Sequence, residues 1–250
     1  MQIILASRRS PDAAPNDDFA AATATVAVVL DGAAAVPGSD TGCVHGTAWF
    51  VHRLGVSFVD LLARNADSST PDNLAQAIVN VNALHAGCDM SSPGSPSAAV
   101  AAVRVKEETI EFLALGGTTI VLEEPSGVLV ISGNRGGDDG TGKRRPTVSS
   151  TVRSDPSVAN HAHIDTMSRR GLRRVVLLTD GASRLADQFG LMDWSGLLDL
   201  LEDGGPELLI EHVRKAERSD PDRLRWPRDQ AYDHATVILC DLRDRAAGQA

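Results

Sequence analysis

Blocks of strand-like segments alternate with blocks of helix-like segments along this 250-residue chain, and that order is the strongest constraint on its fold. Short β-branched or aliphatic runs at 2–6 and 25–30 predict two strands. Between 44 and 63 the apolar residues recur every three or four positions, which is the spacing of one helical face. Thr70 followed by Pro71 predicts the N-cap and first position of a second helix.

A second block of strands follows, and the remaining elements alternate. The expected strands of this block are 98–105, 109–115, 119–123 and 128–132. They precede a strand at 174–179, helices at 193–202 and 206–218, and a final strand at 235–240. Because no internal repeat or linker divides the chain, we expect one α+β domain over residues 1–250, with paired sheets covered by helices.

The composition narrows the class of protein. With 42% hydrophobic residues the chain is too apolar to be disordered, and its longest nearly apolar run, at 20–30, is too short to span a membrane. The formal net charge of −9 argues against nucleic acid or an anionic membrane as a partner. Residues 1–10 lack the pattern of a signal peptide, and the excess of arginine over lysine is typical of a GC-rich bacterial genome. We therefore expect a bacterial, cytoplasmic protein.

The cysteines and one histidine are expected to carry no chemistry. Cys43, Cys88 and Cys240 are far apart in the sequence and form no Cys-X-X-Cys pair. They are expected to be reduced, and to build neither a zinc site nor a disulfide framework. His45 is expected on the polar side of the first helix.

Two segments leave alternatives open. His161 and His163, with Asp165 nearby, are spaced to share a transition metal on an extended segment, but a polar loop or helix end is the favoured interpretation. The glycine-rich, charged stretch at 133–146 is expected to be a mobile loop, and a short polar tail is expected from about residue 243.

Acidic residues stand beside several predicted strands, and this placement is the main chemical signal. The positions are Asp17 and Asp18 before the second strand, Asp31 with Gly32 at its end, Asp180 with Gly181 after the 174–179 strand, and Asp233 before the last strand. Carboxylates on rigid backbone at the rims of sheets would form an all-oxygen site suited to Mg²⁺ or Mn²⁺. Asp-Gly is also a common turn, so the spacing alone leaves both interpretations open.

The order of these motifs resembles that of the metal-dependent type 2C protein phosphatases. Asn16-Asp17-Asp18, Val29-Leu30-Asp31-Gly32, Leu178-Thr179-Asp180-Gly181 and Asp233-His234-Ala235-Thr236 follow the family's order and approximate spacing. The resemblance extends over essentially the whole chain and identifies it as a divergent bacterial member. It implies a four-layer αββα sandwich of two mainly antiparallel sheets flanked by helices. It also implies two Mn²⁺ or Mg²⁺ ions at one end of the sheets.

The resemblance further implies a role for each matched position. Asp31 would bridge both ions, the Gly32 carbonyl would bind one of them, and Asp17 would hold that same ion in place of the family's usual Glu. The expected activity is hydrolysis of a phosphomonoester, in particular of phosphoserine or phosphothreonine in a protein, by water that the two ions activate.

Asp180 and Asp233 would hold the other ion by the same comparison. Asp18 would orient water from behind the ligands. Asp18 and Asp31 are therefore the expected catalytic residues.

Several accessory positions depart from the family pattern. Ala34 and Ala35 stand where the family has two glycines, Gly117 stands where bacterial members have an Asp that binds a third ion, and His234 replaces an Asn. A weak or absent third ion follows from Gly117. The same departures leave a second interpretation open, in which the chain is a non-catalytic binding or regulatory module with this fold.

Overall fold

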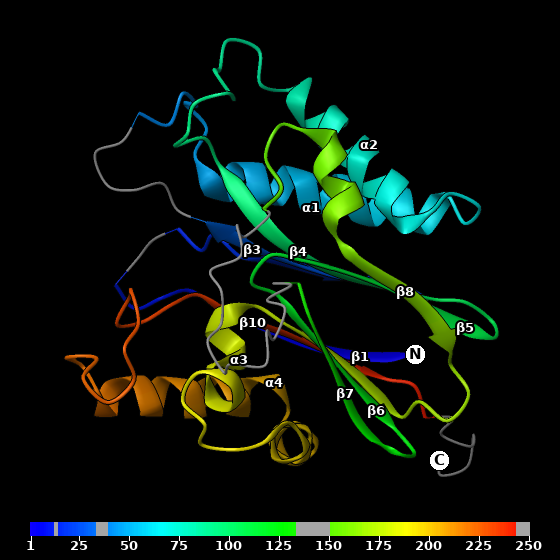
Figure 1. Ribbon diagram of the computed structural model, residues 1–250, viewed down its shortest axis with the longest axis vertical. Coiled ribbons are helices and arrows are strands. Elements are labelled where there is room, and N and C mark those ends of the chain that lie inside the picture. Colours follow the sequence, from blue (N-terminus) through cyan, green and yellow to red (C-terminus); the bar gives the residue numbers. More distant parts are fainter. Residues whose placement is uncertain (13–14, 34–39, 134–150, 244–250) are drawn as a thin grey trace, which may run out of the picture.

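Two five-stranded antiparallel sheets face each other, and a pair of helices covers the outer face of each (Figure 1). The computed structural model describes the whole chain except residues 13–14, 34–39, 134–150 and 244–250. One sheet has the order β1-β10-β9-β6-β7, with strands Gln2–Arg8, Ala235–Asp241, Arg174–Leu178, Thr119–Glu124 and Gly127–Ser132. The other has the order β2-β3-β4-β5-β8, with strands Phe19–Ala22, Val26–Ala33, Ser97–Val105, Thr109–Leu115 and His163–Ser168.

Each sheet has its own helices. α1 (Thr47–Arg64) and α2 (Thr70–Asn82) pack on the β2–β8 sheet. α3 (Asp180–Asp187) and α4 (Trp194–Ser219) pack on the β1–β7 sheet. A short 3-10 helix, η1 (Pro156–His161), precedes β8. The arrangement confirms the expected αββα sandwich.

Alternation along the central strands divides the core into three apolar layers. In β3, Val28 and Leu30 face α1 and α2, whereas Ala27 and Val29 face the opposite sheet. Such a period of two is what a strand buried on both faces requires. The layer between the sheets combines alanines such as Ala27 and Ala101 with larger aliphatic side chains.

Most predicted boundaries agree with the structure to within three residues. The strands at 98–105, 109–115, 119–123 and 128–132 correspond to β4, β5, β6 and β7. The N-cap of α2 is Ser69 rather than Thr70, because the Ser69 hydroxyl accepts the Asp72 backbone N–H at 3.2 Å.

Three short elements were not predicted. β2 is only four residues long, and α3 begins at the Asp-Gly pair that alternatively suggested a turn. A polar loop or helix end was expected around His161 and His163; His161 does end the 3-10 helix η1, but His163 begins the strand β8. This strand is mostly polar because it lies at a sheet edge, where pairing with β5 needs few apolar side chains. The two helices expected at 193–202 and 206–218 form the single element α4, broken at Gly205 where φ is 71°.

Two other expectations concern segments of which little is described. Almost all of the expected 133–146 loop, and the tail beyond Arg243, lie outside the described residues. Within the described part of the chain, no helix combines the length and the apolarity needed to cross a membrane.

Candidate metal centre

A close approach of two backbone segments brings Asp17 beside the end of β3. A Cβ atom built on Gly32 would lie 2.4 Å from the Asp17 carbonyl oxygen and 3.0 Å from Cγ2 of Thr47. Only glycine fits here without moving the backbone. Asp17 is half-buried, and desolvation raises its pKa, although the nearby His234 lowers it.

Asp18 is buried and is held by two threonines from the other sheet. Its Oδ2 accepts the hydroxyl groups of Thr236, at 2.7 Å, and Thr179, at 3.2 Å. Its Oδ1 is buried without a hydrogen-bond partner in the described structure. Burial raises the pKa of Asp18 to about 8, against the lowering effect of the threonine hydroxyls.

Asp31 and Asp180 are joined across the two sheets. Oδ2 of Asp31 accepts the backbone N–H of Asp180 at 3.1 Å, so the end of β3 meets the first residue of α3. Although solvent reaches both carboxylates, desolvation by the surrounding protein raises the pKa of Asp31 well above its usual range, and the charges of Asp180 and Asp18 raise it further. Desolvation and the charge of Asp233 raise the pKa of Asp180 to about 6.

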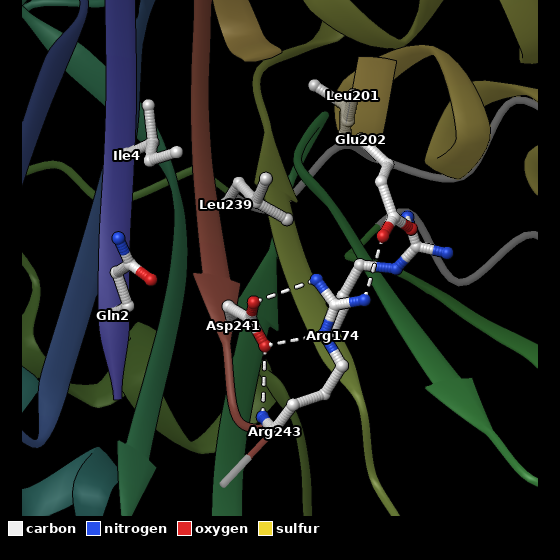
Figure 2. A pocket seen from close by; sticks show the side chains of 8 residues that line it. All are labelled: Gln2, Ile4, Arg174, Leu201, Glu202, Leu239, Asp241 and Arg243. Atoms are coloured by element: carbon white, nitrogen blue, oxygen red, sulfur yellow. Dashed lines mark hydrogen bonds and ion pairs between the residues drawn. The ribbon is translucent and has the colours of Figure 1, made fainter. Parts of the chain in front are cut away.

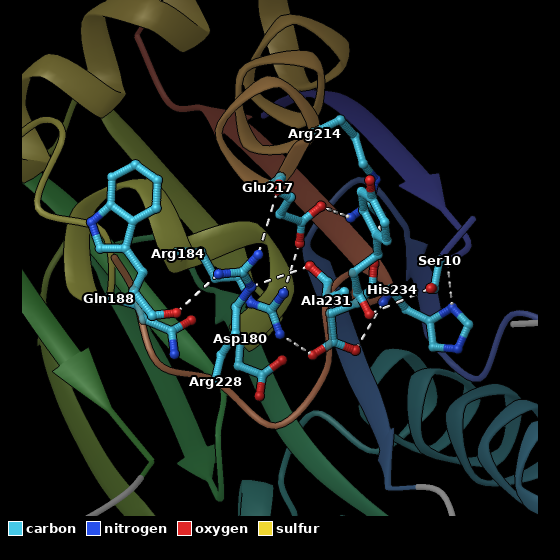
Figure 3. A network of polar contacts seen from close by, with 12 residues as sticks. Ser10, Asp180, Arg184, Gln188, Arg214, Glu217, Arg228, Ala231 and His234 are labelled. Carbon is cyan, nitrogen blue, oxygen red and sulfur yellow. Dashed lines mark hydrogen bonds and ion pairs between the residues drawn. The ribbon is translucent and has the colours of Figure 1, made fainter. Parts of the chain in front are cut away.

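Asp233 is close enough to Asp180 to raise its pKa, but it is ion-paired to an arginine. Nη2 of Arg184 donates to Oδ2 of Asp233 at 2.6 Å, and Nη1 donates to the fully buried Glu217 at 2.7 Å. Figure 3 shows Arg184 between Asp180 and Glu217. Glu217 also accepts Nη1 of Arg214, at 2.6 Å, and Arg214 in turn reaches the Asp233 carbonyl. One candidate ligand is therefore already charge-compensated, whereas Asp18 and Asp31 are not.

His234 ties the N-terminal segment to this network. Its Nδ1 accepts the backbone N–H of Ser10 at 3.0 Å, which fixes the neutral tautomer with the proton on Nε2. Burial lowers the pKa of His234, and the carboxylates of Asp17 and Asp233 oppose that effect. The imidazole that replaces the family's Asn is thus a structural acceptor.

The donor set fits hard divalent cations. The candidate ligand side chains are all carboxylates, the Asp17 carbonyl lies against Gly32, and Asp18 has a buried oxygen with no partner in the described structure. Mutual repulsion contributes to the raised pKa values, and bound cations would remove it. In the described residues no three of these acidic side chains place ligand oxygens within 4.8 Å of one another, so the carboxylates are adjacent without forming a tight cluster.

The position of Gly117 is consistent with a missing ligand. A Cβ built on Gly117 would lie 3.7 Å from Oδ2 of Asp180, which is ordinary contact. A side chain there would reach the site directly, and glycine supplies none.

Arg184 and Glu217 were missed by the sequence analysis. A signal existed for Glu217, because it continues the apolar face of α4 formed by Leu209, Ile210 and Val213. A carboxylate on a buried helical face requires a cationic partner. No comparable signal pointed to Arg184, since the helix that carries it was not predicted.

The histidine pair at 161 and 163 is divided between two elements. His161 ends η1 and His163 begins β8, where its ring packs edge-on against Phe112 with centroids 6.1 Å apart. In the part of the chain that is described, these histidines and Asp165 do not form a metal-binding group.

A pocket of about 190 Å³ opens at the opposite end of the β1–β7 sheet (Figure 2). Arg174 and Arg243 line it, and they pair with Glu202 at 2.8 Å each, while Arg243 also pairs with Asp241. Because these charges compensate each other, the pocket offers no free ionic group to a ligand from this set.

Comparisons with known proteins agree with this fold. No curated protein matches the sequence. The chain resembles the serine/threonine phosphatase PstP/Ppp of Mycobacterium tuberculosis, with a TM-score of 0.61 and 15% identity over 96% of this chain and 98% of that one. It also resembles the serine/threonine phosphatase Stp1 of Staphylococcus aureus, with a TM-score of 0.64 and 11% identity over 97% and 95% of the two chains.

A structure described as the PstP catalytic domain in complex with two manganese ions gives a TM-score of 0.60 and 14% identity, covering 96% of this chain and 97% of that one. At such identities the likeness shows the fold. The family model described as "Protein phosphatase 2C" matches residues 7–208. The chain belongs to the protein phosphatase 2C family.

Proposed function

We propose that this protein is a metal-dependent serine/threonine protein phosphatase with a binuclear Mn²⁺ or Mg²⁺ centre. The observation that carries the proposal is the convergence of Asp18, Asp31 and Asp180, whose pKa values are all raised. Keeping adjacent, desolvated carboxylates ionised at neutral pH costs free energy, and bound divalent cations offset that cost. The chain is proposed to act as one domain over residues 1–250, in the cytoplasm.

Each side chain has a proposed task. Asp31 is proposed to bridge two ions, since its carboxylate accepts the Asp180 N–H and the next residue, Gly32, lies against Asp17. Asp17 and the Gly32 carbonyl would hold one ion, and Asp180 with Asp233 would hold the other. Two such ions lower the pKa of water and stabilise the charge of a phosphomonoester during hydrolysis.

Asp18 is proposed to orient water at the site without binding either ion directly. Thr179 and Thr236 fix its Oδ2, which leaves the unpartnered Oδ1 to accept a proton or orient water. The substrates would be phosphorylated proteins or other phosphomonoesters, and no nucleic acid or membrane is expected as a partner.

A non-catalytic binding module is the second candidate. The Arg184–Asp233 ion pair favours it, because an arginine already compensates one ligand of the second ion. In that case the cleft would hold phosphorylated partners without hydrolysing them.

Phosphate release separates the two candidates. Purified protein is incubated with p-nitrophenyl phosphate and a phosphothreonine peptide in Mn²⁺, in Mg²⁺ and in EDTA, and Mn²⁺ binding is measured by calorimetry. The enzyme requires metal-dependent release that Asp180→Asn abolishes. Asp222→Asn, which changes an exposed carboxylate, should leave it intact. Metal binding without turnover supports the binding module, and no Mn²⁺ binding at millimolar concentration contradicts both candidates.

A further inference from the structure

Cys43, His45 and Cys88 come together although they lie on two separate segments. Their ligand atoms all lie within 4.8 Å of one another, and they form the one such group in the described residues. Nδ1 of His45 is 3.7 Å from Sγ of Cys43 and 3.5 Å from Sγ of Cys88. The sequence predicted no zinc site because Cys43 and Cys88 are separated by 44 residues, with helices α1 and α2 between them, yet the fold brings the two cysteines together.

These distances match a tetrahedral site. Zn–S bonds of about 2.3 Å and Zn–N bonds of about 2.05 Å that meet at a tetrahedral angle place sulfur and nitrogen about 3.6 Å apart. The observed 3.7 and 3.5 Å lie on either side of that value. The backbone N–H of His45 also donates to Sγ of Cys43 at 3.4 Å, which fixes the position of that sulfur.

The two segments are packed tightly at this point. The Asp89 N–H donates to the Gly42 carbonyl at 2.7 Å. A Cβ on Gly42, where φ is +64°, would lie 2.1 Å from the Asp89 carbonyl oxygen, so only glycine permits this approach. Residues on either side of the contact, Cys43 and Cys88, therefore face each other on constrained backbone.

A buried imidazole stands beside the group. His85 is 5% exposed, and its ring lies edge-on to that of His45 with centroids 5.3 Å apart. Its Nδ1 lies 3.1 Å from the Val81 carbonyl, whereas its buried Nε2 has no partner. A histidine whose Nδ1–H is held by a carbonyl presents the Nε2 lone pair to a metal.

We propose that Cys43, His45 and Cys88 form a Zn²⁺ site, with the adjacent His85 turning in as the fourth ligand, that ties the start of α1 to the chain following α2. Two thiolates and two imidazoles are the donors that Zn²⁺ prefers, and they differ in kind from the carboxylates around Asp31. The site would also steady Thr47, two residues after His45, which contacts the position of Gly32. The proposal does not depend on phosphatase activity.

Cobalt substitution tests the site. The full chain, purified with a thiol-free reductant and no chelator, is analysed for metal content and titrated with Co²⁺. We expect one equivalent of tightly bound Zn²⁺, and a Co²⁺ form with thiolate charge-transfer bands and the visible bands of tetrahedral cobalt. Excess Mn²⁺ or Mg²⁺ should not displace the ion, whereas oxygen-ligated Co²⁺ at the carboxylates would give no charge-transfer band.

Variants assign the ligands. We expect each of four single variants to lower Zn²⁺ affinity by more than about tenfold: Cys43→Ser, Cys88→Ser, His45→Gln and His85→Gln. A loss of about tenfold already follows when a hydrogen-bond partner of a metal ligand is removed, so loss of the ligand itself should cost more. Cys240→Ala, which removes the remaining thiol, and Asp180→Asn should retain the spectrum. Full affinity in any of the four ligand variants overturns the assignment. A Cys43–Cys88 disulfide in metal-free protein that was prepared under reducing conditions would also overturn the assignment.

Discussion

Arg184 links Asp233 to Glu217, donating to the first at 2.6 Å and to the second at 2.7 Å. Both arginine and glutamate are almost fully buried. Since Arg184 lies one helical turn after Asp180 in α3, a single short helix supplies one candidate ligand and anchors another. This ion-pair chain joins the candidate metal centre to the C-terminal end of α4.

Replacing Arg184 should destabilise the fold. Arg184→Gln leaves the buried Glu217 with only Arg214 among the arginines that hold it now, so we expect the free energy of unfolding to fall by about 3 kcal/mol. Arg8→Gln is the matched control, because the Arg8–Glu207 pair is exposed and should change stability by less than about 1 kcal/mol. Urea denaturation of both variants measures the difference, and equal losses would contradict a buried role for Arg184.

Asp31→Asn should stabilise the metal-free protein and weaken its binding of Mn²⁺. Because a carboxylate is hard to ionise at this position, the amide should raise the thermal midpoint of the metal-free protein at pH 8. The same change should weaken Mn²⁺ binding by more than about 100-fold, since it removes a direct ligand. Thermal unfolding with and without Mn²⁺ shows both effects. A destabilised metal-free variant would mean that Asp31 is stabilising in its own right.

The metal-free protein should lose stability as the pH rises. Free Asp titrates near 3.8, whereas the folded state holds protons on Asp180 up to about pH 6 and on Asp18 up to about pH 8. Between these values the folded state binds more protons than the unfolded state, so the free energy of unfolding decreases from pH 4 to pH 8. Saturating Mn²⁺ should flatten this slope. Urea denaturation across that range, with EDTA or Mn²⁺, measures it, and a metal-free slope of opposite sign refutes the assignment.

Glycine is required at position 32 but not at position 117. Gly32→Ala forces the added methyl against the Asp17 carbonyl at 2.4 Å, which should cost about 1–3 kcal/mol and weaken Mn²⁺ binding. Gly117→Ala places its methyl in ordinary contact, 3.7 Å from Asp180, and should change stability by less than about 1 kcal/mol. Chemical denaturation and Mn²⁺ calorimetry compare the pair. If Gly32→Ala binds Mn²⁺ like the wild type, the close approach does not shape the site.

The sequence predicted the strands better than the polar chemistry around them. The alternation in β3 and the apolar runs of β9 and β10 follow from burial, which leaves a direct pattern in the sequence. The family resemblance indicated the αββα fold, which the structure confirms, and the acidic positions, whose roles as ligands remain predictions. The ion pairs of Arg184 and the proximity of Cys43 to Cys88 are contacts between segments that are distant in the sequence. The periodicity of a single segment gives no information about such contacts.

The order of strands in one sheet also sets when the site can assemble. β1 is the first strand of this sequence to be synthesised, and its hydrogen-bonded neighbour is β10, the last strand of the described chain. β10 also separates β1 from β9, so a nascent chain carries β1 unpaired until residues 235–241 have been made. Pairing between strands so far apart in the sequence is slow, because the chain loses conformational entropy on closing the long loop before the contacts between the strands stabilise it. Asp233 lies just before β10, so Asp31 and Asp180 acquire that carboxylate neighbour only after every other described strand has been synthesised.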